Sequence, residues 1–267
     1  MSTTPDDPGP RVVQAGPPVL EVDLGPGFRA GFTQRAGGVS PAPWDSLNLG
    51  LGVQDDADRV RANRARASAW LGRPVRFATQ VHGTHVAVLG SDEPAGSAPD
   101  TVGDADALVA SPDAPVGLGV LVADCVPVLL VDPGTGVVAA AHAGRRGLAD
   151  GVVGQVLRAM AELGADVRTV RAAVGPSVCG SCYEVPATLR AEVAAARPVT
   201  WSTTSWGTAA LDLPAGVVAD LEAAGVADVV RTGVCTLEDD RFFSHRRATW
   251  AGTTTGRFAG LVARSAG

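Results

Sequence analysis

A cysteine and a histidine stand near the two ends of an apolar hairpin in which strand packing needs neither side chain. The segment ADCVPVLLVDPGTGVVAAAHAGRRG covers residues 123–147, with Cys125 near its start and His142 near its end. Thiolate and imidazole both bind zinc, and together they also form the nucleophile and base of cysteine hydrolases. The sequence therefore predicts either a metal site or a reactive pair in this hairpin.

The turn PGTG determines how the two strands pair. If Asp132 pairs with Val137, then Pro127 pairs with His142, and Cys125 lies diagonally across from His142. Residues two apart on a strand share a face, so the two Cα atoms would be about 7–8 Å apart, with the side chains closer. One metal ion could bridge them, although a buried cysteine and a hydrogen-bonded core histidine would also occupy such positions.

A third ligand could come from TQVHGTHV, where Gly83 separates His82 from His85. Three ligands of the type His-Cys-His, with a fourth position open, are typical of catalytic rather than structural zinc. Residues three apart do not face the same way along a strand, so spacing alone does not decide which of the two histidines binds.

The composition narrows the classes of function. The chain has 28 acidic and 22 basic residues, a net charge of −6, and no lysine. This balance disfavours nucleic-acid and anionic-membrane partners. The lack of lysine excludes Schiff-base chemistry and a Walker-type phosphate loop, so a phosphate group must be bound by arginine or backbone amides.

The remaining sequence predicts the elements that position these residues. Residues 1–18 are rich in proline and glycine and are expected to form a disordered tail, followed by a single domain over 19–267. Strands are predicted over 28–33, 75–81, 84–89, 119–123, 126–132, 137–142, 171–175, 209–213 and 228–232, and helices over 55–72, 148–164, 186–197 and 214–225. With no signal peptide or membrane span recognised, we expect a cytoplasmic protein with reduced thiols.

Six motifs, in order, resemble the YfiH-like family, also called the laccase-domain or polyphenol oxidoreductase family. They are TQVHGTHV, DADALV, ADCVPVLL, AAAHAGRRGL, GPSVCGSCYEV and CTLEDDRFFSHRR followed by TGRFAGL. The resemblance implies a single-domain α/β (α+β) fold with a mixed β-sheet core layered with helices, similar to CNF-type cysteine hydrolases. It also implies a zinc ion held by His82, Cys125 and His142.

Proteins of this family are described as purine nucleoside phosphorylases acting on adenosine, inosine and methylthioadenosine, with adenosine deaminase activity in the same site. The resemblance thus implies a purine nucleoside and phosphate as partners. Four residues are candidates for substrate binding: Arg35, Asn48, His85 and Arg246. The family's AHAGWRG reads AHAGRRG here, so Arg145 stands where relatives carry tryptophan.

Three alternatives stay open from the sequence. Cys125 and His142 could form a Cys-His hydrolase of amide bonds, a chemistry described for relatives that edit cell-wall precursors. A single Cu²⁺ could replace zinc in an oxidoreductase acting on phenols, because the ligand set also suits copper. With four histidines in the chain, a multicopper cluster is excluded by counting. A non-catalytic, zinc-stabilised binding protein is the third alternative.

Several further residues have two interpretations. Asp104 and Asp106 in GDADALV are equally good turn residues and site supports, and Asp124 has a structural or supporting role beside Cys125. The CxxC pair Cys179 and Cys182, without a second pair, indicates a structural role. A homodimer and a monomer are both compatible with the sequence.

Overall fold

Two large β-sheets pack face to face within residues 16–94 and 101–265, which this computed structural model describes. The first sheet has six strands in the order β12 (Asp228–Arg231), β9 (Arg171–Val174), β7 (Val126–Val131), β8 (Val138–Ala143), β5 (Ala107–Ala110) and β4 (Val86–Leu89). The second has five in the order β1 (Val19–Glu21), β2 (Phe28–Thr33), β13 (Phe258–Arg264), β6 (Gly117–Val122) and β3 (Val75–Arg76). The predicted mixed α/β fold is thereby confirmed.

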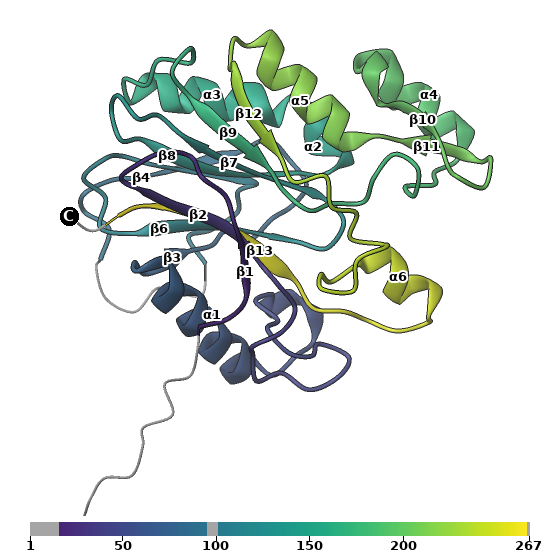
Figure 1. Ribbon diagram of the computed structural model, residues 1–267, viewed down its shortest axis with the longest axis horizontal. Helices are drawn as coiled ribbons and strands as arrows, with labels where there is room; N and C mark the ends of the chain where they lie inside the picture. The colour runs from purple at the N-terminus through teal and green to yellow at the C-terminus, as the bar shows by residue number, and fades with distance from the viewer. Residues whose placement is uncertain (1–15, 95–100, 266–267) are drawn as a thin grey trace, which may run out of the picture.

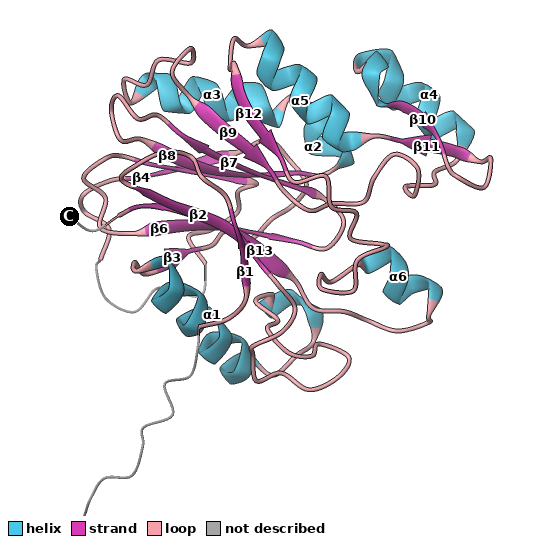
Figure 2. Ribbon diagram, viewed as in Figure 1, coloured by secondary structure: helices cyan, strands magenta, loops and turns pink. Residues whose placement is uncertain are grey.

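Helices cover the outer faces of the two sheets (Figure 1, Figure 2). On the outer side of the six-stranded sheet lie α2 (Arg145–Ala149), α3 (Val152–Glu162) and α5 (Leu213–Ala223). The helix α1 (Ala57–Leu71) packs on the five-stranded sheet. Beside these layers lie α4 (Ala187–Ala196) with the small sheet of β10 (Trp201–Thr203) and β11 (Ala209–Leu211), and α6 (His245–Trp250).

The strand β7 is buried on both faces. Val126, Val128 and Leu130 pack toward the helices, whereas Leu129 and Val131 pack between the two sheets. Such a strand is apolar along its whole length rather than alternating with polar residues. The layer between the sheets is the core against which the end of the hairpin that carries Cys125 and His142 is placed.

The predicted hairpin register is confirmed. Val131 pairs with Val138, and Pro127 pairs with His142. The turn is held by the Asp132 carboxylate, which accepts hydrogen bonds from the backbone N–H groups of Gly134 and Thr135 at 3.2 Å each. The PGTG sequence therefore fixes the position of His142 along its strand.

Two predicted elements differ from the observed ones for local reasons. The single helix expected over 148–164 is broken between α2 and α3 at Gly151, whose φ is 90°. The strand expected over 75–81 ends at Arg76. Beyond it, the Gln80 side-chain amide bonds to both the N–H and the carbonyl of Leu121, at 2.7 Å each, in place of a backbone ladder.

Some elements were not predicted at all, namely β1, β5, β10, β13 and α6. The expected disordered tail over 1–18 falls largely on residues 1–15, which lie outside the described residues. In the part of the chain that the structure describes, no helix combines the length and apolar character needed to cross a membrane.

Candidate metal centre

Three side chains from two separate segments converge at one end of the inter-sheet layer. The ligand atoms of His82, Cys125 and His142 all lie within 4.8 Å of one another. The Cys125 sulfur is 3.8 Å from His82 Nε2, and the two imidazole rings are 4.8 Å apart between centroids and nearly perpendicular, at 82°. The three residues thus offer one nitrogen, one sulfur and one nitrogen to a common point.

The hairpin explains why Cys125 and His142 meet. His142 lies on β8 on the same face as Ala140, which packs between the sheets. Cys125 immediately precedes β7 and packs against the apolar cluster formed by Val122, Ala123, Phe242, Phe243 and Phe258. The ligand pair therefore lies where the inter-sheet core reaches the end of the hairpin.

Asp106 orients both histidines from a fully buried position. Its Oδ1 lies 2.8 Å from His142 Nδ1. Because an ionised carboxylate only accepts hydrogen bonds, Nδ1 carries the proton and His142 Nε2 is left for a metal ion. The same carboxylate accepts the backbone N–H groups of Val81, His82 and Gly83 at 3.2, 2.9 and 2.6 Å. Burial raises the pKa of Asp106, but these hydrogen bonds and the charge of His142 lower it by more, so the net shift of the pKa is downward.

The loop that carries His82 is held in an unusual backbone conformation. His82 has a φ of 59°, in the left-handed region that costs most residues about 1–3 kcal/mol. Gly144 makes room for it, because a Cβ there would lie 2.8 Å from His82 Cδ2 and 3.4 Å from the Cys125 sulfur. The glycine of AHAG therefore permits the close approach of all three ligands.

The protonation of Cys125 and His142 is strongly coupled. Burial alone raises the pKa of the Cys125 thiol, but the charge of His142 and hydrogen bonds from both histidines lower it to about 6. Burial lowers the pKa of His142, whereas the Cys125 thiolate and Asp106 raise it to about 9. Without a metal ion the pair is therefore thiolate and imidazolium at neutral pH.

This donor set fits a zinc or copper ion. A thiolate and two imidazoles are soft and borderline ligands, and three protein ligands leave a fourth position for substrate or water. An aspartate bonded to the far nitrogen of a ligating histidine is the usual support of such sites. The geometry is equally compatible with a Cys-His pair that reacts directly.

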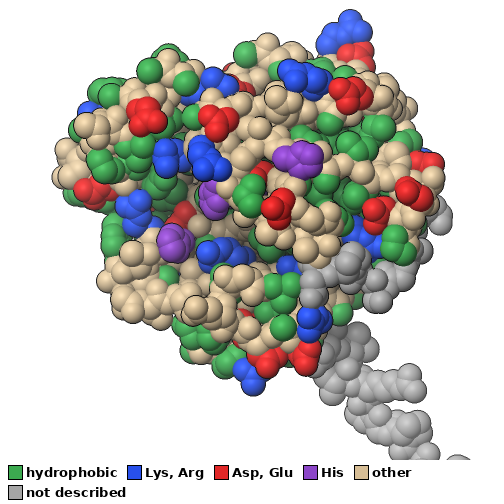
Figure 3. All heavy atoms as spheres, turned by 180° about the vertical axis from the view of Figure 1, so that it is seen from behind, with side chains coloured by type: hydrophobic (Ala, Val, Ile, Leu, Met, Phe, Trp, Pro, Cys, Tyr) green, Lys and Arg blue, Asp and Glu red, His purple; other side chains and the backbone are tan. Residues whose placement is uncertain are grey.

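Two cavities meet at His82 and Cys125, and His142 lines the larger of them. A larger one of about 590 Å³ is lined by Gln80, Arg257 and η1 (Leu51–Val53), and a second of about 460 Å³ is lined by Tyr183 and three arginines. Both cavities are lined by His82, Ala123, Cys125 and His245. Figure 3 shows histidine side chains close to arginine side chains on one face of the molecule. Two of the three candidate ligands thus face both cavities.

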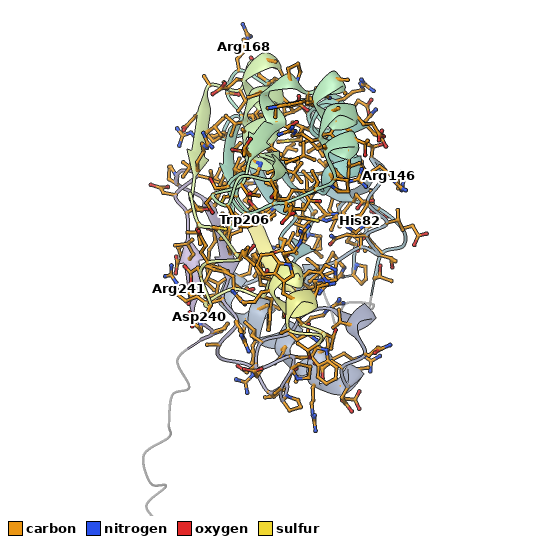
Figure 4. All side chains as sticks on the ribbon, turned by 90° about the vertical axis from the view of Figure 1, so that its right-hand side faces the viewer. His82, Arg146, Arg168, Trp206, Asp240 and Arg241 are labelled. Atoms are coloured by element: carbon orange, nitrogen blue, oxygen red, sulfur yellow. The ribbon has the colours of Figure 1, made fainter. Side chains whose placement is uncertain are left out.

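The arginines of the second cavity are Arg145, Arg146 and Arg246. Arg146 donates to the carbonyl oxygens of Val81 and His82 at 3.1 Å each, and Figure 4 shows Arg146 and His82 on the same side of the molecule. Within the described residues, the Arg145 guanidinium has no hydrogen bond or ion pair, so its donors are available to a ligand.

Of the four candidate substrate-binding residues, Arg246 lines the second cavity. Its guanidinium donates to the Glu184 carbonyl at 2.9 Å and lies 5.3 Å from the centre of the Tyr183 ring. Arg35, Asn48 and His85 line neither cavity.

Arg35 is paired with Asp45 at 2.7 Å. Asn48 is fully buried and bonds to Gly50, Asp55 and Arg257. His85 is exposed, and its carbonyl pairs with Asp106. A substrate role for these three residues stays a prediction.

Sequence reasoning left Asp106 undecided and did not single out His245, Tyr183 or Arg257. All four lie inside motifs that carry the family resemblance, respectively DADALV, FFSHRR, GSCYEV and TGRFAGL. The motifs indicated the right segments but did not indicate which residue in each segment lies at the site. Asp104 is exposed, whereas Asp106 is buried, so the two aspartates have different environments.

Asp124 supports the site from beside Cys125. Its carboxylate accepts from Thr236 Oγ1 at 2.7 Å and from the Arg246 N–H at 2.6 Å. Its φ is 88°, so the backbone turns directly before the ligand. Cys179 and Cys182 belong to a different group of side chains and are not part of this centre.

Comparison with known proteins places this chain in a family. Residues 29–265 match the family model described as multi-copper polyphenol oxidoreductase laccase. A purine nucleoside phosphorylase of Streptomyces coelicolor is 53% identical over 239 residues, covering 88% of this chain and 95% of that protein. Another, of Mycobacterium tuberculosis, is 46% identical over 233 residues, covering 86% and 89%.

Solved structures agree. YlmD from Geobacillus stearothermophilus has a TM-score of 0.80 and 35% identity, covering 90% of this chain and 93% of its own. YfiH from Bacillus licheniformis has a TM-score of 0.78 and 29% identity, covering 89% and 93%. The matched motifs, the fold and the relatives lead to one conclusion: the chain belongs to the YfiH-like family described as multi-copper polyphenol oxidoreductase laccase.

Proposed function

We propose that the protein is a zinc-dependent purine nucleoside phosphorylase acting on adenosine, inosine and methylthioadenosine. The observation that carries the proposal is the junction of two cavities at His82 and Cys125, where His142 lines the larger cavity and three arginines line the other. Zinc bound by these ligands would supply Lewis acidity at an open position. The names of the relatives point to the same reaction.

In this reaction a phosphate oxygen bonds to C1′ of the ribose while the bond from C1′ to the purine nitrogen breaks. The bond electrons leave with the purine, which takes up a proton. Arginine forks match phosphate oxygens, so we assign phosphate binding to Arg145, Arg146 and Arg246. We assign the nucleoside to the larger cavity and the proton for the leaving purine to His245, which lines both spaces.

Adenosine deaminase activity would use the same site with water in place of phosphate, adding oxygen at the purine C6 and releasing ammonia. The zinc-deaminase signature His-x-Glu with Pro-Cys-x-x-Cys does not occur in the sequence, so this activity would rest on the present ligand set. A cytoplasmic location, where nucleosides and phosphate are both available and thiols stay reduced, completes the proposal.

The test measures bound metal in the purified full-length protein and incubates inosine or adenosine with and without phosphate. We expect zinc, release of free base together with ribose 1-phosphate only when phosphate is present, and loss of both metal and activity in His82→Ala. Copper in place of zinc, with phenol oxidation and no base release, would support the oxidoreductase instead.

Arg145→Ala tests the phosphate assignment separately. Losing one charge-assisted hydrogen bond of about 1.5 kcal/mol should raise the KM for phosphate about tenfold while the KM for nucleoside changes little. Arg168→Ala is the matched control, because Arg168 is an exposed arginine paired with Asp166 at the far end of the molecule (Figure 4). An equal effect of both variants would refute the assignment.

The coupled pKa values of Cys125 and His142 favour one second candidate, a Cys-His amide hydrolase, because a thiolate beside an imidazolium is the resting state of such enzymes. In that mechanism Cys125 attacks the carbonyl carbon and His142 returns the proton to the leaving amine. Activity on amides that survives in His82→Ala and disappears in Cys125→Ala would select it over the phosphorylase.

A further inference from the structure

A second cluster of metal-binding side chains lies apart from the first. The ligand atoms of Cys179, Cys182, Cys235 and Glu238 all lie within 4.8 Å of one another. Cys182 and Cys235 are only 3% and 7% exposed, whereas Glu238 reaches the cluster from the surface. The CxxC pair therefore has partners that sequence spacing did not reveal.

The sheet topology explains why these residues meet. The strands β9 and β12 are parallel neighbours, with Val174 paired to Arg231, so the loops that follow them leave the sheet at the same edge. The pairing continues beyond the strands as a bridge between Ser177 and Cys235, in which Thr236 N–H donates to the Ser177 carbonyl at 3.1 Å. The loop with CGSC and the loop with CTLE thus run side by side.

Local hydrogen bonds orient the side chains toward one point. The Cys182 N–H donates to the Cys179 carbonyl at 3.0 Å, which folds CGSC into a tight turn with both thiols on one side. The Cys182 thiol donates to Glu238 Oε1 at 3.5 Å. Apolar packing would account for buried cysteines, but it gives no reason for a carboxylate to join them.

We propose that Cys179, Cys182, Cys235 and Glu238 bind a structural zinc ion. Three thiolates and one carboxylate complete a tetrahedral set without an open position, as structural zinc sites require. With Zn–S bonds of about 2.3 Å, tetrahedral sulfurs lie about 3.8 Å apart, so the cluster needs only a small contraction to close around the ion. Binding releases the three thiol protons.

The site would stabilise the surroundings of Cys125 without taking part in chemistry. The two loops hold Asp124 directly, through the Val178 N–H at 3.0 Å and the Thr236 hydroxyl at 2.7 Å. Asp124 precedes Cys125 in the chain, so a zinc ion that fixes both loops fixes the approach to the first centre. This proposal does not depend on the proposed function.

The test is the zinc content of the full-length protein, purified under reducing conditions with zinc present. We expect about two zinc ions per chain in the wild type, about one in Cys182→Ser and about one in His82→Ala. Glu238→Gln changes an exposed ligand and keeps its size, so it tests the site should Cys182→Ser fail to fold. It should bind zinc at least about tenfold more weakly at one of the two sites.

Cobalt gives an independent readout. Replacing zinc by Co²⁺ in His82→Ala should produce the intense sulfur-to-cobalt absorption of a three-thiolate site, which Cys235→Ser should weaken and Asp240→Asn, at a neighbouring exposed acid, should leave unchanged. Zinc content that is unaffected by Cys182→Ser, or a Cys179–Cys182 disulfide that persists in the native protein purified under reducing conditions, would overturn the proposal. Zinc lost in Cys182→Ser but retained in His82→Ala would leave this site standing and refute the first centre.

Discussion

At the scale of single residues, metal binding at the proposed centre depends on the ionisation of the Cys125 thiol. The thiol lies beside His142 and His82, which together outweigh the effect of burial on its pKa. A thiolate formed at neutral pH is ready to bind a metal ion without an unfavourable deprotonation step.

In metal-free protein, alkylation of Cys125 by iodoacetamide should therefore rise with pH about a midpoint near 6, well below the ordinary 9 of a thiol. Since the pKa is lowered, the reactive thiolate is present above this midpoint and is lost by protonation below it. Mass spectrometry of the Cys125 peptide gives the profile. A midpoint above 8 would contradict it, and added zinc should protect the residue.

One carboxylate, that of Asp106, bonds to the His142 ring and to the backbone of His82, two of the proposed metal ligands. Asp106→Asn replaces it by an amide that cannot accept from His142 and the loop N–H groups together. We expect metal affinity to fall about 10–100-fold, the usual cost of losing such support. Asp104→Asn, two residues earlier and exposed, is the control for the same change, measured by competition with a zinc chelator. Equal affinities in the two variants would argue against this role.

At the scale of elements, the PGTG turn keeps His142 in register. The Asp132 carboxylate accepts hydroxyl hydrogen bonds from Thr135 and Thr169 at 2.7 Å each, besides the two N–H bonds of the turn. Burial raises the pKa of Asp132, but these bonds outweigh it and lower the pKa below 3.8. The carboxylate therefore stabilises the hairpin in its ionised form.

Asp132→Asn should lower the free energy of unfolding at pH 7 by about 1–3 kcal/mol, because a buried acceptor network loses partners. The folded pKa is depressed, so the carboxylate's contribution is present above pH 3.8 and lost as the pH falls below it. Urea unfolding of the wild type and variant should thus give curves that converge in acid. Asp113→Asn, at an exposed position, should behave as the wild type.

The elements also show what the sequence could and could not predict. The hairpin was predictable, because a recognised turn and a period of two determine register and face. β13 was not, since FAGLVAR is buried along nearly its whole length and lacks alternation. The strand after Arg76 was overestimated, because a glutamine side chain can replace backbone pairing. Asp106 needed the tertiary structure, since its partners lie on two different segments.

At the scale of the whole molecule, the centre joins the two sheets. His82 lies in the connection from β3 of the five-stranded sheet to β4 of the six-stranded sheet, and the other two ligands lie at the hairpin of the latter. An ion bound to all three proposed ligands would therefore stabilise the folded state as a whole, by mass action.

Removing the metal should lower the melting temperature by about 5–10 °C, since an ion at 100 times its Kd contributes about 2.7 kcal/mol. The measurement uses Cys182→Ser, so that only the first centre is read. In the double variant with His82→Ala, added zinc should no longer shift the melting temperature. A shift of the same size there would mean that zinc acts elsewhere.

The candidate ligands and the cavity walls come from different parts of the chain, and this has a consequence for how substrate preference could change. His82, Cys125 and His142 are fixed by a core hairpin and a buried aspartate, while the walls come from η1, the α2 start and the α6 start, all near the surface. Substitutions in those walls, such as one at Arg145, would alter which molecule fits without disturbing the three candidate ligands. The wall residues, rather than the buried side chains of the centre, are therefore the positions at which a change of substrate preference would leave the fold intact.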